Sequence, residues 1–429
     1  MSAPPAPDDS QRRRAFAILF AVLLTSAAAN TAMQSVLPAI GREIGIPDVL
    51  VVAIFSLSAL FWAITSPIWA RASDTRGRKP LVALGTVGFG VSMLGFALVV
   101  QAGLRHLIAP LVVFGGAMMA RAIFGLVGSA SFPAAQAYVA DHTERTERTG
   151  AMATMASAAG LGTILGPAVA PFFVLPFVGL SGPMFAFALI AFGVLFVVSR
   201  WLPDDRAGVE PTLDGETPTL ARPSARVRWR DPRIAPFIIY GFLLSSAQAI
   251  NGQTLGFMII DKLGVAPSKA QSFTGVAMMA GAGASLLAQW GLIRMLRLGP
   301  RQLLRWGAGL AALGNLIVAF APSYGTVVAA FALCSLGYGF ARPGFTAGAS
   351  LAVGPEEQGA VAGAVSAING ACIIVAPVLG VGLYGWLHPS PYLLNLVLLA
   401  GLVAYALRNP SLRAVGETPP DEPEMSALD

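Results

Sequence analysis

A short charged segment, 71–80, separates two uncharged stretches that are each long enough to cross a membrane. Neither the preceding stretch, 49–70, nor the following one, 81–101, contains an acidic or basic residue. A helix needs about 20 consecutive apolar residues to span the hydrocarbon core of a bilayer. The pattern therefore predicts two membrane-spanning helices joined by a charged loop at the membrane surface.

The composition of the whole chain also indicates an integral membrane protein. Of its 429 residues, 55% are hydrophobic and only 12% are charged, whereas soluble domains are about one quarter charged. The apolar segments are long and unbroken, which favours helices, because a membrane barrel shows alternating segments of about ten residues. The first apolar stretch, 15–39, is longer than the apolar region of a secretion signal and is interpreted as the first span.

Catalytic and metal-binding patterns are missing from the sequence. No nucleophile–base constellation, phosphate loop or dinucleotide fingerprint appears, so we predict neither an enzyme nor a cofactor. The histidines His106, His142 and His388 are scattered, and no metal site is predicted. Cys334 and Cys372 lie in apolar segments and are expected to be small buried residues. The basic pI of about 9.7 reflects charges at span ends, so nucleic acid is not an expected partner.

Twelve transmembrane helices are predicted, in two halves of six. We expect an N-terminal half (1–201), a polar cytoplasmic linker (202–233), a C-terminal half (234–408) and a disordered tail (409–429). The predicted spans are 15–40, 48–70, 79–102, 107–138, 149–176, 181–201, 234–260, 270–293, 302–321, 325–350, 358–386 and 390–408.

Basic residues predict the orientation, because cytoplasmic loops carry an excess of Lys and Arg. With the N-terminus in the cytoplasm, nearly all of the 28 basic residues fall on the cytoplasmic side. The exceptions are Arg42, Arg105, Lys262 and Lys269 on the outer side and Arg121 and Arg342 inside spans. We therefore expect a multi-pass protein of the inner membrane with both termini in the cytoplasm.

A weak internal repeat supports two related halves. At an offset of 210 residues, Pro133 corresponds to Pro343, and Gly160 corresponds to Gly370. Pro167 corresponds to Pro377 at the same offset. Glycine and proline set helix kinks and close helix contacts, so these matches align the fourth and fifth spans with the tenth and eleventh.

The charged loop carries Asp74, Gly77, Arg78 and Lys79, and the fourth span ends at Asp141. Together with twelve spans in two halves, this pattern resembles the major facilitator superfamily, and within it the twelve-span drug/proton antiporter branch that includes the tetracycline exporters. The resemblance covers residues from about 15 to 408. It implies the major facilitator fold and alternating access between two halves.

The resemblance also implies a role for the charged loop. In such carriers Asp74, Arg78 and Asp141 would form a cluster that latches the outward-open state, with Asp74 facing the start of the eleventh span. The loop departs from the family pattern at Ala70 and Thr75, where a glycine and a basic residue are usual. The alternative is that these charges are solvated and only set the topology.

Two further motifs carry the resemblance. Arg121 in the fourth span lies in a stretch similar to the family's second motif, and an arginine in the membrane needs a polar cavity or partner. Gly162, Gly166 and Pro167 match the antiporter motif of exporters, although Ala170 and Pro171 replace its closing glycines. Helix packing alone is the alternative interpretation of this glycine pattern.

No acidic residue falls at the centre of a predicted span, whereas proton-coupled exporters resembling this chain usually have one there. Asp48 and Asp261 lie near outer span ends. A cavity with Arg121 and Arg342 and no carboxylate is electropositive, which suits anionic, zwitterionic or neutral substrates. Further candidates for the cavity are amides of the lining spans: Asn30, Gln34, Gln248, Asn251, Gln253 and Asn369.

The sequence favours a secondary transporter that exports amphipathic small molecules, with coupling to protons left open. A carrier of an anionic solute, such as an organic acid or metallophore, is the first alternative and would use Arg121 and Arg342 as ligands. A non-transporting membrane sensor is the second. The expected partners are a small-molecule substrate, the lipid bilayer and, if transport is coupled to them, protons.

Overall fold

The apolar segments form long helices joined by short turns. The structure, a computed structural model, describes residues 9–143, 147–204, 231–354 and 357–415. The first part contains α1 (Asp9–Ile44), α2 (Asp48–Arg76), α3 (Arg78–Leu104), α4 (Pro110–Leu126), η1 (Gly128–Ala130), α5 (Ser131–Asp141), α6 (Arg148–Val169), η2 (Ala170–Phe173) and α7 (Gly182–Trp201). The second contains α8 (Ala235–Leu263), α9 (Pro267–Leu286), η4 (Leu287–Leu292), α10 (Ile293–Met295), α11 (Pro300–Ala319), α12 (Tyr324–Leu351), α13 (Gln358–Trp386), α14 (Ser390–Arg408) and α15 (Pro410–Ala414).

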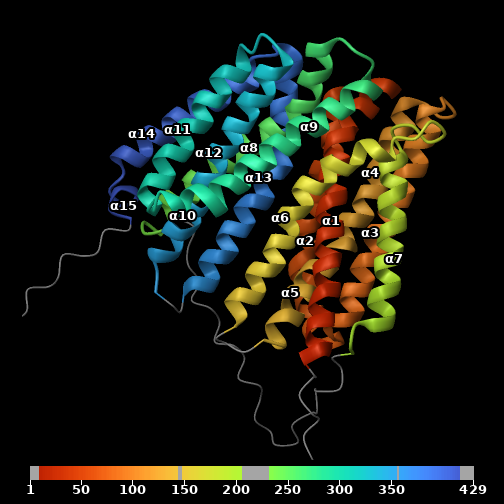
Figure 1. Ribbon diagram of the computed structural model, residues 1–429, viewed down its shortest axis with the longest axis horizontal. Helices are drawn as coiled ribbons and strands as arrows, with labels where there is room; N and C mark the ends of the chain where they lie inside the picture. The colour runs from red at the N-terminus through yellow and green to blue at the C-terminus, as the bar shows by residue number, and fades with distance from the viewer. Residues whose placement is uncertain (1–8, 144–146, 205–230, 355–356, 416–429) are drawn as a thin grey trace, which may run out of the picture.

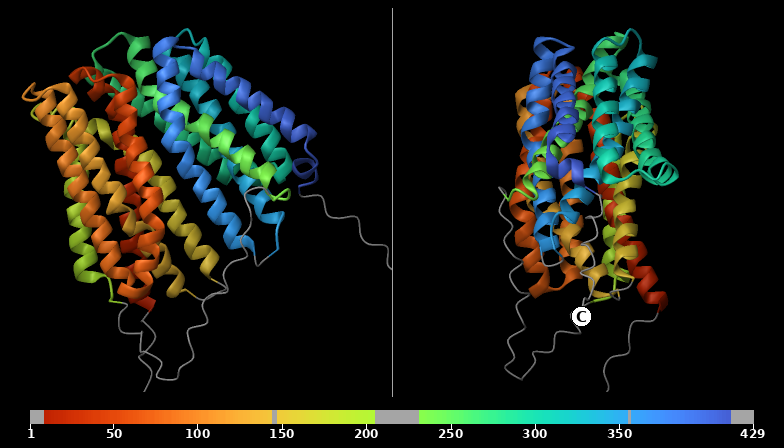
Figure 2. Two further views of the ribbon diagram at one scale, coloured as in Figure 1. Left: turned by 180° about the vertical axis from the view of Figure 1, so that it is seen from behind. Right: turned by 90° about the vertical axis from the view of Figure 1, so that its left-hand side faces the viewer.

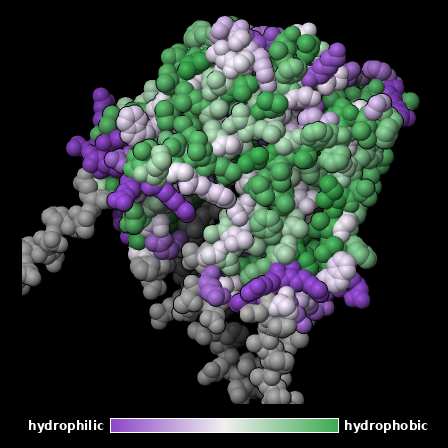
Figure 3. All heavy atoms as spheres, viewed as in Figure 1, coloured by the Kyte–Doolittle hydropathy of each residue, from purple (hydrophilic) through white to green (hydrophobic). Residues whose placement is uncertain are grey.

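Within the described residues these helices combine into twelve rods of membrane length, which confirms the predicted all-α fold. Three of the rods combine several elements: α4 continues through η1 into α5, α6 continues into η2, and α9 continues through η4 into α10. Ten of them are long and apolar enough to cross a membrane by length and composition. The other two, α8 and α11, are not among these ten. Figure 3 shows apolar side chains across the middle of the visible face and hydrophilic ones at its edges.

The rods form two groups that lie side by side, α1–α7 and α8–α14 (Figures 1 and 2). The groups converge at one end and diverge at the other (Figure 1). We call the first the Arg42 end, after the residue at the end of α1, and the second the Arg78 end, after the residue at the start of α3. A Cβ on Gly256 of α8 would lie 2.6 Å from Pro38 of α1, so the two groups pack tightly near the Arg42 end.

Glycines of α6 and α9 let α6 pack closely against α1 of its own group and against α9 of the second group. A Cβ on Gly162 would lie 2.6 Å from Ala27 of α1, and one on Gly166 would overlap the carbonyl oxygen of Ala28. On the other side, Gly275 of α9 would place a Cβ 2.8 Å from the carbonyl oxygen of Pro167. The residues predicted from the antiporter motif therefore lie where α6 contacts α1 and α9.

The fourth rod differs from the uninterrupted span predicted for 107–138. It changes to a 3-10 turn at η1 before continuing as α5. Gly85 and Gly88 of α3 face this turn, and a Cβ on Gly88 would lie 2.8 Å from the Val127 side chain. Close approach of α3 thus coincides with the local change in helix geometry, which periodicity alone does not reveal.

Each group has an ion pair that joins its first helix to its fifth rod at the Arg78 end. In the first group, Arg12 Nη1 lies 3.3 Å from Glu147 Oε2. In the second group, Arg233 donates to both carboxylate oxygens of Glu357, at 2.9 and 3.0 Å. These hydrogen bonds lower the pKa of Glu357. Glu147 and Glu357 differ by the 210-residue offset of the sequence repeat, and we call the two pairs the Arg–Glu braces.

The predicted linker and tails are only partly described. Residues 205–230 of the linker, together with 1–8 and 416–429, lie outside the described residues. The tail predicted to begin at 409 instead opens with helix α15. Asn409 caps it, because its side-chain oxygen accepts hydrogen bonds from the backbone N–H groups of Ser411 and Leu412.

Replacing Gly166 by alanine is expected to weaken the contact between α1 and α6. The new methyl group would meet backbone atoms of α1, and overpacking of this kind costs about 1–3 kcal/mol. Gly160→Ala, in the same helix, is the matched control because nothing lies within 4 Å of its added Cβ. Thermal unfolding of the purified variants tests this. An equal or higher midpoint for Gly166→Ala than for Gly160→Ala would contradict it.

Candidate functional site

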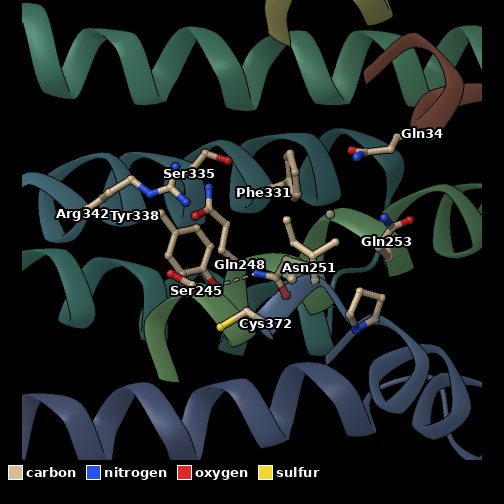
Figure 4. A pocket seen from close by; sticks show the side chains of 14 residues that line it. Gln34, Ser245, Gln248, Asn251, Gln253, Phe331, Ser335, Tyr338, Arg342 and Cys372 are labelled. Atoms are coloured by element: carbon tan, nitrogen blue, oxygen red, sulfur yellow. Dashed lines mark hydrogen bonds between the residues drawn. The ribbon is translucent and has the colours of Figure 1, made fainter. Parts of the chain in front are cut away.

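A cavity of about 260 Å³ is lined mainly by α8, α12 and α13, with Gln34 of α1 contributing from the first group. In Figure 4, Arg342 and Tyr338 lie toward one end of the cavity, and Gln34 and Gln253 lie toward the other. The lining residues are Gln34, Ser245, Gln248, Ala249, Asn251, Gly252, Gln253, Phe331, Ser335, Tyr338, Arg342, Cys372, Ile373 and Pro377.

Five of the predicted cavity residues line this space. Four supply amides, Gln34, Gln248, Asn251 and Gln253, and Arg342 supplies a guanidinium group. Arg342 is exposed, which makes its charge accessible to a solute. The side chain of Asn369, another predicted candidate, lies outside the described side chains, although its backbone belongs to α13.

Arg121 and Asn30 form a separate polar centre in the first group and are not among the lining residues. Arg121 is only 2% exposed, and its Nη2 donates a 2.9 Å hydrogen bond to Asn30 Oδ1. The guanidinium carbon lies 4.3 Å from the Phe124 ring centre and 5.6 Å from that of Phe55. Its Nε and Nη1 have no hydrogen-bond partner among the described residues, so this centre retains unused donors.

The charge of the cavity wall comes from Arg342. Among the described residues, no acidic side chain lines the cavity. The remaining polar groups are amides, hydroxyls and the thiol of Cys372, which accepts a 3.4 Å hydrogen bond from Ser246. Both cysteines are free and buried, as predicted, but Cys372 also borders the cavity. The arrangement can offer hydrogen-bond donors and one positive charge to a solute.

A cluster of charges ties the two groups together at the Arg42 end. Arg42 donates two hydrogen bonds of 2.7 Å to Asp48 of α2. It also lies 3.2 Å from Asp261 of α8, whose carboxylate accepts a 2.9 Å bond from Tyr384 of α13. His388 Nε2 is 3.8 Å from the same carboxylate. We call these five residues the Arg42 clasp.

The predicted latch residues meet at the opposite end. Arg78 Nε lies 2.9 Å from Asp141 Oδ2, and Arg78 also pairs with Asp74. All three belong to the first group. The described contacts of Asp74 do not extend to Gln358 at the start of α13, which instead donates a 2.9 Å hydrogen bond to the carbonyl oxygen of Ser350. The charge cluster therefore forms within one group, while the two groups diverge at this end.

Sequence reasoning missed part of the cavity and the Arg42 clasp. Tyr338, Ser335 and Ser245 line the cavity, but nothing in their spacing distinguishes them from residues that face other helices. The internal repeat could have indicated two further lining residues. Phe331 is the counterpart of Arg121, Pro377 is the counterpart of Pro167, and both Phe331 and Pro377 line the cavity. The clasp could have been suspected from Arg42, Asp48 and Asp261, which are among the few charges on the side predicted to face outward.

Breaking the Arg42 clasp is expected to open the Arg42 end more often. In Arg42→Gln, Asp48 and Asp261 lose their shared cation. Partly exposed ion pairs contribute about 1 kcal/mol or less, so we expect a roughly threefold to fivefold shift in population. The measurement is the labelling rate of Gln34→Cys, in a chain lacking Cys334 and Cys372, by an impermeant maleimide added at the Arg42 side.

Arg105→Gln serves as the control for that measurement. Arg105 also lies beyond a helix end, but its described hydrogen bond, to the carbonyl oxygen of Phe177, stays within the first group. It should leave the labelling rate unchanged. A rate in Arg42→Gln no higher than in Arg105→Gln would refute the role of the clasp.

Comparisons with known proteins agree with this geometry. A family model described as Major Facilitator Superfamily matches residues 18–377 and 258–426. Multidrug resistance protein 2 of Bacillus subtilis (strain 168) is 26% identical over 358 residues, which cover 82% of this chain and 83% of that protein. Multidrug resistance protein MdtG of Dickeya zeae (strain Ech586) is 31% identical over 161 residues, or 38% of this chain and 35% of that protein.

Solved structures share the fold at low sequence identity. A point mutant of the nucleoside transporter NupG aligns with a TM-score of 0.71 and 12% identity, covering 91% of this chain and 99% of that one. An inward-facing, unoccupied bacterial homologue of the human lysosomal transporter Spinster gives 0.70 and 14%, covering 95% and 98%. On the family match across most of its length, this chain belongs to the Major Facilitator Superfamily and is a multi-pass membrane transporter, not an enzyme.

Proposed function

We propose that this secondary transporter exports amphipathic small molecules that are neutral or negatively charged. The observation that supports this most is the cavity wall, on which Arg342 is the charged group among the described lining residues. A positive potential without a compensating carboxylate disfavours lipophilic cations and favours anions and polar neutral molecules. Phe331, Ile373 and Pro377 supply apolar surface for the rest of such a molecule.

Export is inferred from the relatives. Two of them are named multidrug resistance proteins, and a transporter can provide resistance by removing compounds from the cell. In this proposal the Arg78 end faces the cytoplasm of the cell, with both chain ends on that side of the inner membrane. The divergence of the two groups at that end then corresponds to an inward-facing state, from which the cavity loads.

The coupling of transport to an ion is a separate part of the proposal. No described acidic side chain borders the cavity, so protonation of a cavity carboxylate is not part of the mechanism that we propose. The substrate's own protonation, or exchange against another solute, provides the alternative. The described carboxylates of the helix bundle lie instead toward its two ends, as in the Arg42 clasp and beside Arg78.

A second candidate function is a carrier of an anionic solute, such as an organic acid or metallophore. Arg121 favours it, because two nitrogens of this buried guanidinium have no described hydrogen-bond partner. A fold relative, the human organic anion transporter MFSD10, aligns with a TM-score of 0.58 and 20% identity, covering 92% of this chain and 100% of that one. At that identity the likeness concerns the fold, and the substrate class rests on the arginines.

A matched set of compounds tests the proposed charge preference. 1-Naphthoate, 1-naphthamide and 1-naphthylmethylammonium share an aromatic body and differ in charge. Purified protein should bind the first two and discriminate against the cation. Arg342→Gln should weaken naphthoate binding roughly tenfold or more, since hydrogen bonds to charged groups contribute about 1.5–3 kcal/mol, and should affect naphthamide much less. Isothermal titration measures the affinities.

The transport arm uses proteoliposomes loaded with each compound. Arg105→Gln is again the control, because it removes one arginine away from the cavity. Preferential binding and transport of the ammonium compound would contradict the proposal. Loss of naphthoate binding in Arg121→Gln, with Arg342→Gln unaffected, would favour the second candidate function and place the anion at the other arginine.

A further inference from the structure

Two residues of the cavity wall belong to a chain of buried polar side chains that runs across the second group of helices. Asn251 and Tyr338 line the cavity, and a 3.0 Å hydrogen bond from Asn251 Nδ2 to Tyr338 Oη joins them (Figure 4). Behind them lie Asn395 of α14 and Asn315 of α11, neither of which is exposed. The four side chains therefore connect α14, α8, α12 and α11.

A backbone carbonyl fixes the orientation of this chain at one end. Asn395 Nδ2 donates to the carbonyl oxygen of Ala247 at 3.1 Å and to Asn251 Oδ1 at 2.8 Å. A carbonyl oxygen can only accept a hydrogen bond, so the nitrogen of Asn395 must face α8. The oxygen of Asn251 then faces Asn395, and its NH₂ group is directed to Tyr338.

A second backbone carbonyl fixes the other end. Asn315 Nδ2 donates to the carbonyl oxygen of Ala311 at 2.8 Å. Its amide nitrogen also lies 3.4 Å from Tyr338 Oη and 3.5 Å from Cys334 Sγ. The amide of Asn315 thus presents N–H, and not its oxygen, to the tyrosine.

These orientations determine what the tyrosine hydroxyl can do. A phenolic oxygen has two acceptor positions and one hydrogen. Asn251 and Asn315 both donate to the oxygen of Tyr338, which occupies its acceptor positions. The hydroxyl group can then act toward any further partner only as a donor. Arg342 on the same wall is also a donor without acceptor capacity.

We propose that Asn395 and Asn315 are positioning residues that hold Tyr338 as a hydrogen-bond donor, so that the cavity selects substrates by an acceptor oxygen, such as a carbonyl, carboxylate or phosphoryl oxygen. The proposal rests on the proposed function, because it names the chemical group by which the exported molecule is recognised. Since Asn395 and Asn315 do not line the cavity, they act through Asn251 and Tyr338.

A pair of uncharged probe compounds separates the effect of a hydrogen-bond acceptor on binding from the effect of the ligand's charge. 1-Acetylnaphthalene carries a carbonyl oxygen, and 1-isopropenylnaphthalene has nearly the same shape with a CH₂ group in its place. The purified full-length protein should bind the ketone roughly fivefold to tenfold more tightly, as one neutral hydrogen bond contributes about 1 kcal/mol. Tyr338→Phe should abolish this preference and leave the affinity for the alkene unchanged.

Asn395→Leu tests positioning, since it removes the group that orients Asn251 without touching the cavity. The preference for the ketone should fall below about twofold while the alkene binds as before. In the double variant with Tyr338→Phe, Asn395→Leu should cause no further loss, because residues that act through one another are not additive. If Asn395→Leu does not fold, Asn315→Leu replaces it, because Asn315 donates directly to Tyr338 Oη.

Asn409→Leu is the matched control. Its amide also bonds a tyrosine hydroxyl, that of Tyr405, but away from the cavity lining, and it should keep the full preference. Wild-type protein that binds both probes alike, or binds neither, overturns the proposal. An Asn395→Leu variant that keeps the preference for the ketone also overturns it. So does an Asn395→Leu variant that binds the ketone and the alkene more weakly by the same factor, since that result indicates a purely structural role.

The result also separates this inference from the proposed function. If the ketone preference and its loss in Asn395→Leu are observed but no compound is transported, the proposed export falls and the recognition of acceptors stands. If export of naphthoate is observed while Asn395→Leu and Tyr338→Phe behave as wild type toward the ketone, the export stands and the positioning role is refuted.

Discussion

Inside a bilayer, a polar group must find its partner within the protein. Helices satisfy this requirement for the backbone, and the same helices offer carbonyl oxygens against which buried side chains orient. Asn395 and Asn315 each use such an oxygen, from Ala247 and Ala311. Arg121 is the contrasting case, because aromatic rings and one amide surround it and two of its nitrogens have no described partner.

The fold could be predicted largely from the sequence, since lipid imposes long apolar helices and the basic loops alternate with them. Local geometry could not. The turn at η1 lies where Gly85 and Gly88 let α3 approach closely, and the helix α15 begins at the cap that Asn409 provides. Both arise from contacts between particular residues, which hydropathy does not register.

The candidate site was predicted less completely. Polar residues in apolar spans indicated Gln34, Gln248, Asn251, Gln253 and Arg342, and all five line the cavity. The sequence could not show that Arg121 and Asn30 bond to each other in the first group, because the rotation of each helix about its axis follows from packing. For the same reason Tyr338, a residue without charge or unusual spacing, did not stand out.

The Arg–Glu braces have a mechanical consequence. Each one joins the first helix of a group to its fifth rod at the Arg78 end, and neither crosses between the groups. Neither pair therefore has to break when the two groups move apart or together at this end. The braces restrain the neighbouring helix ends within each group and leave the distance between the groups free to change.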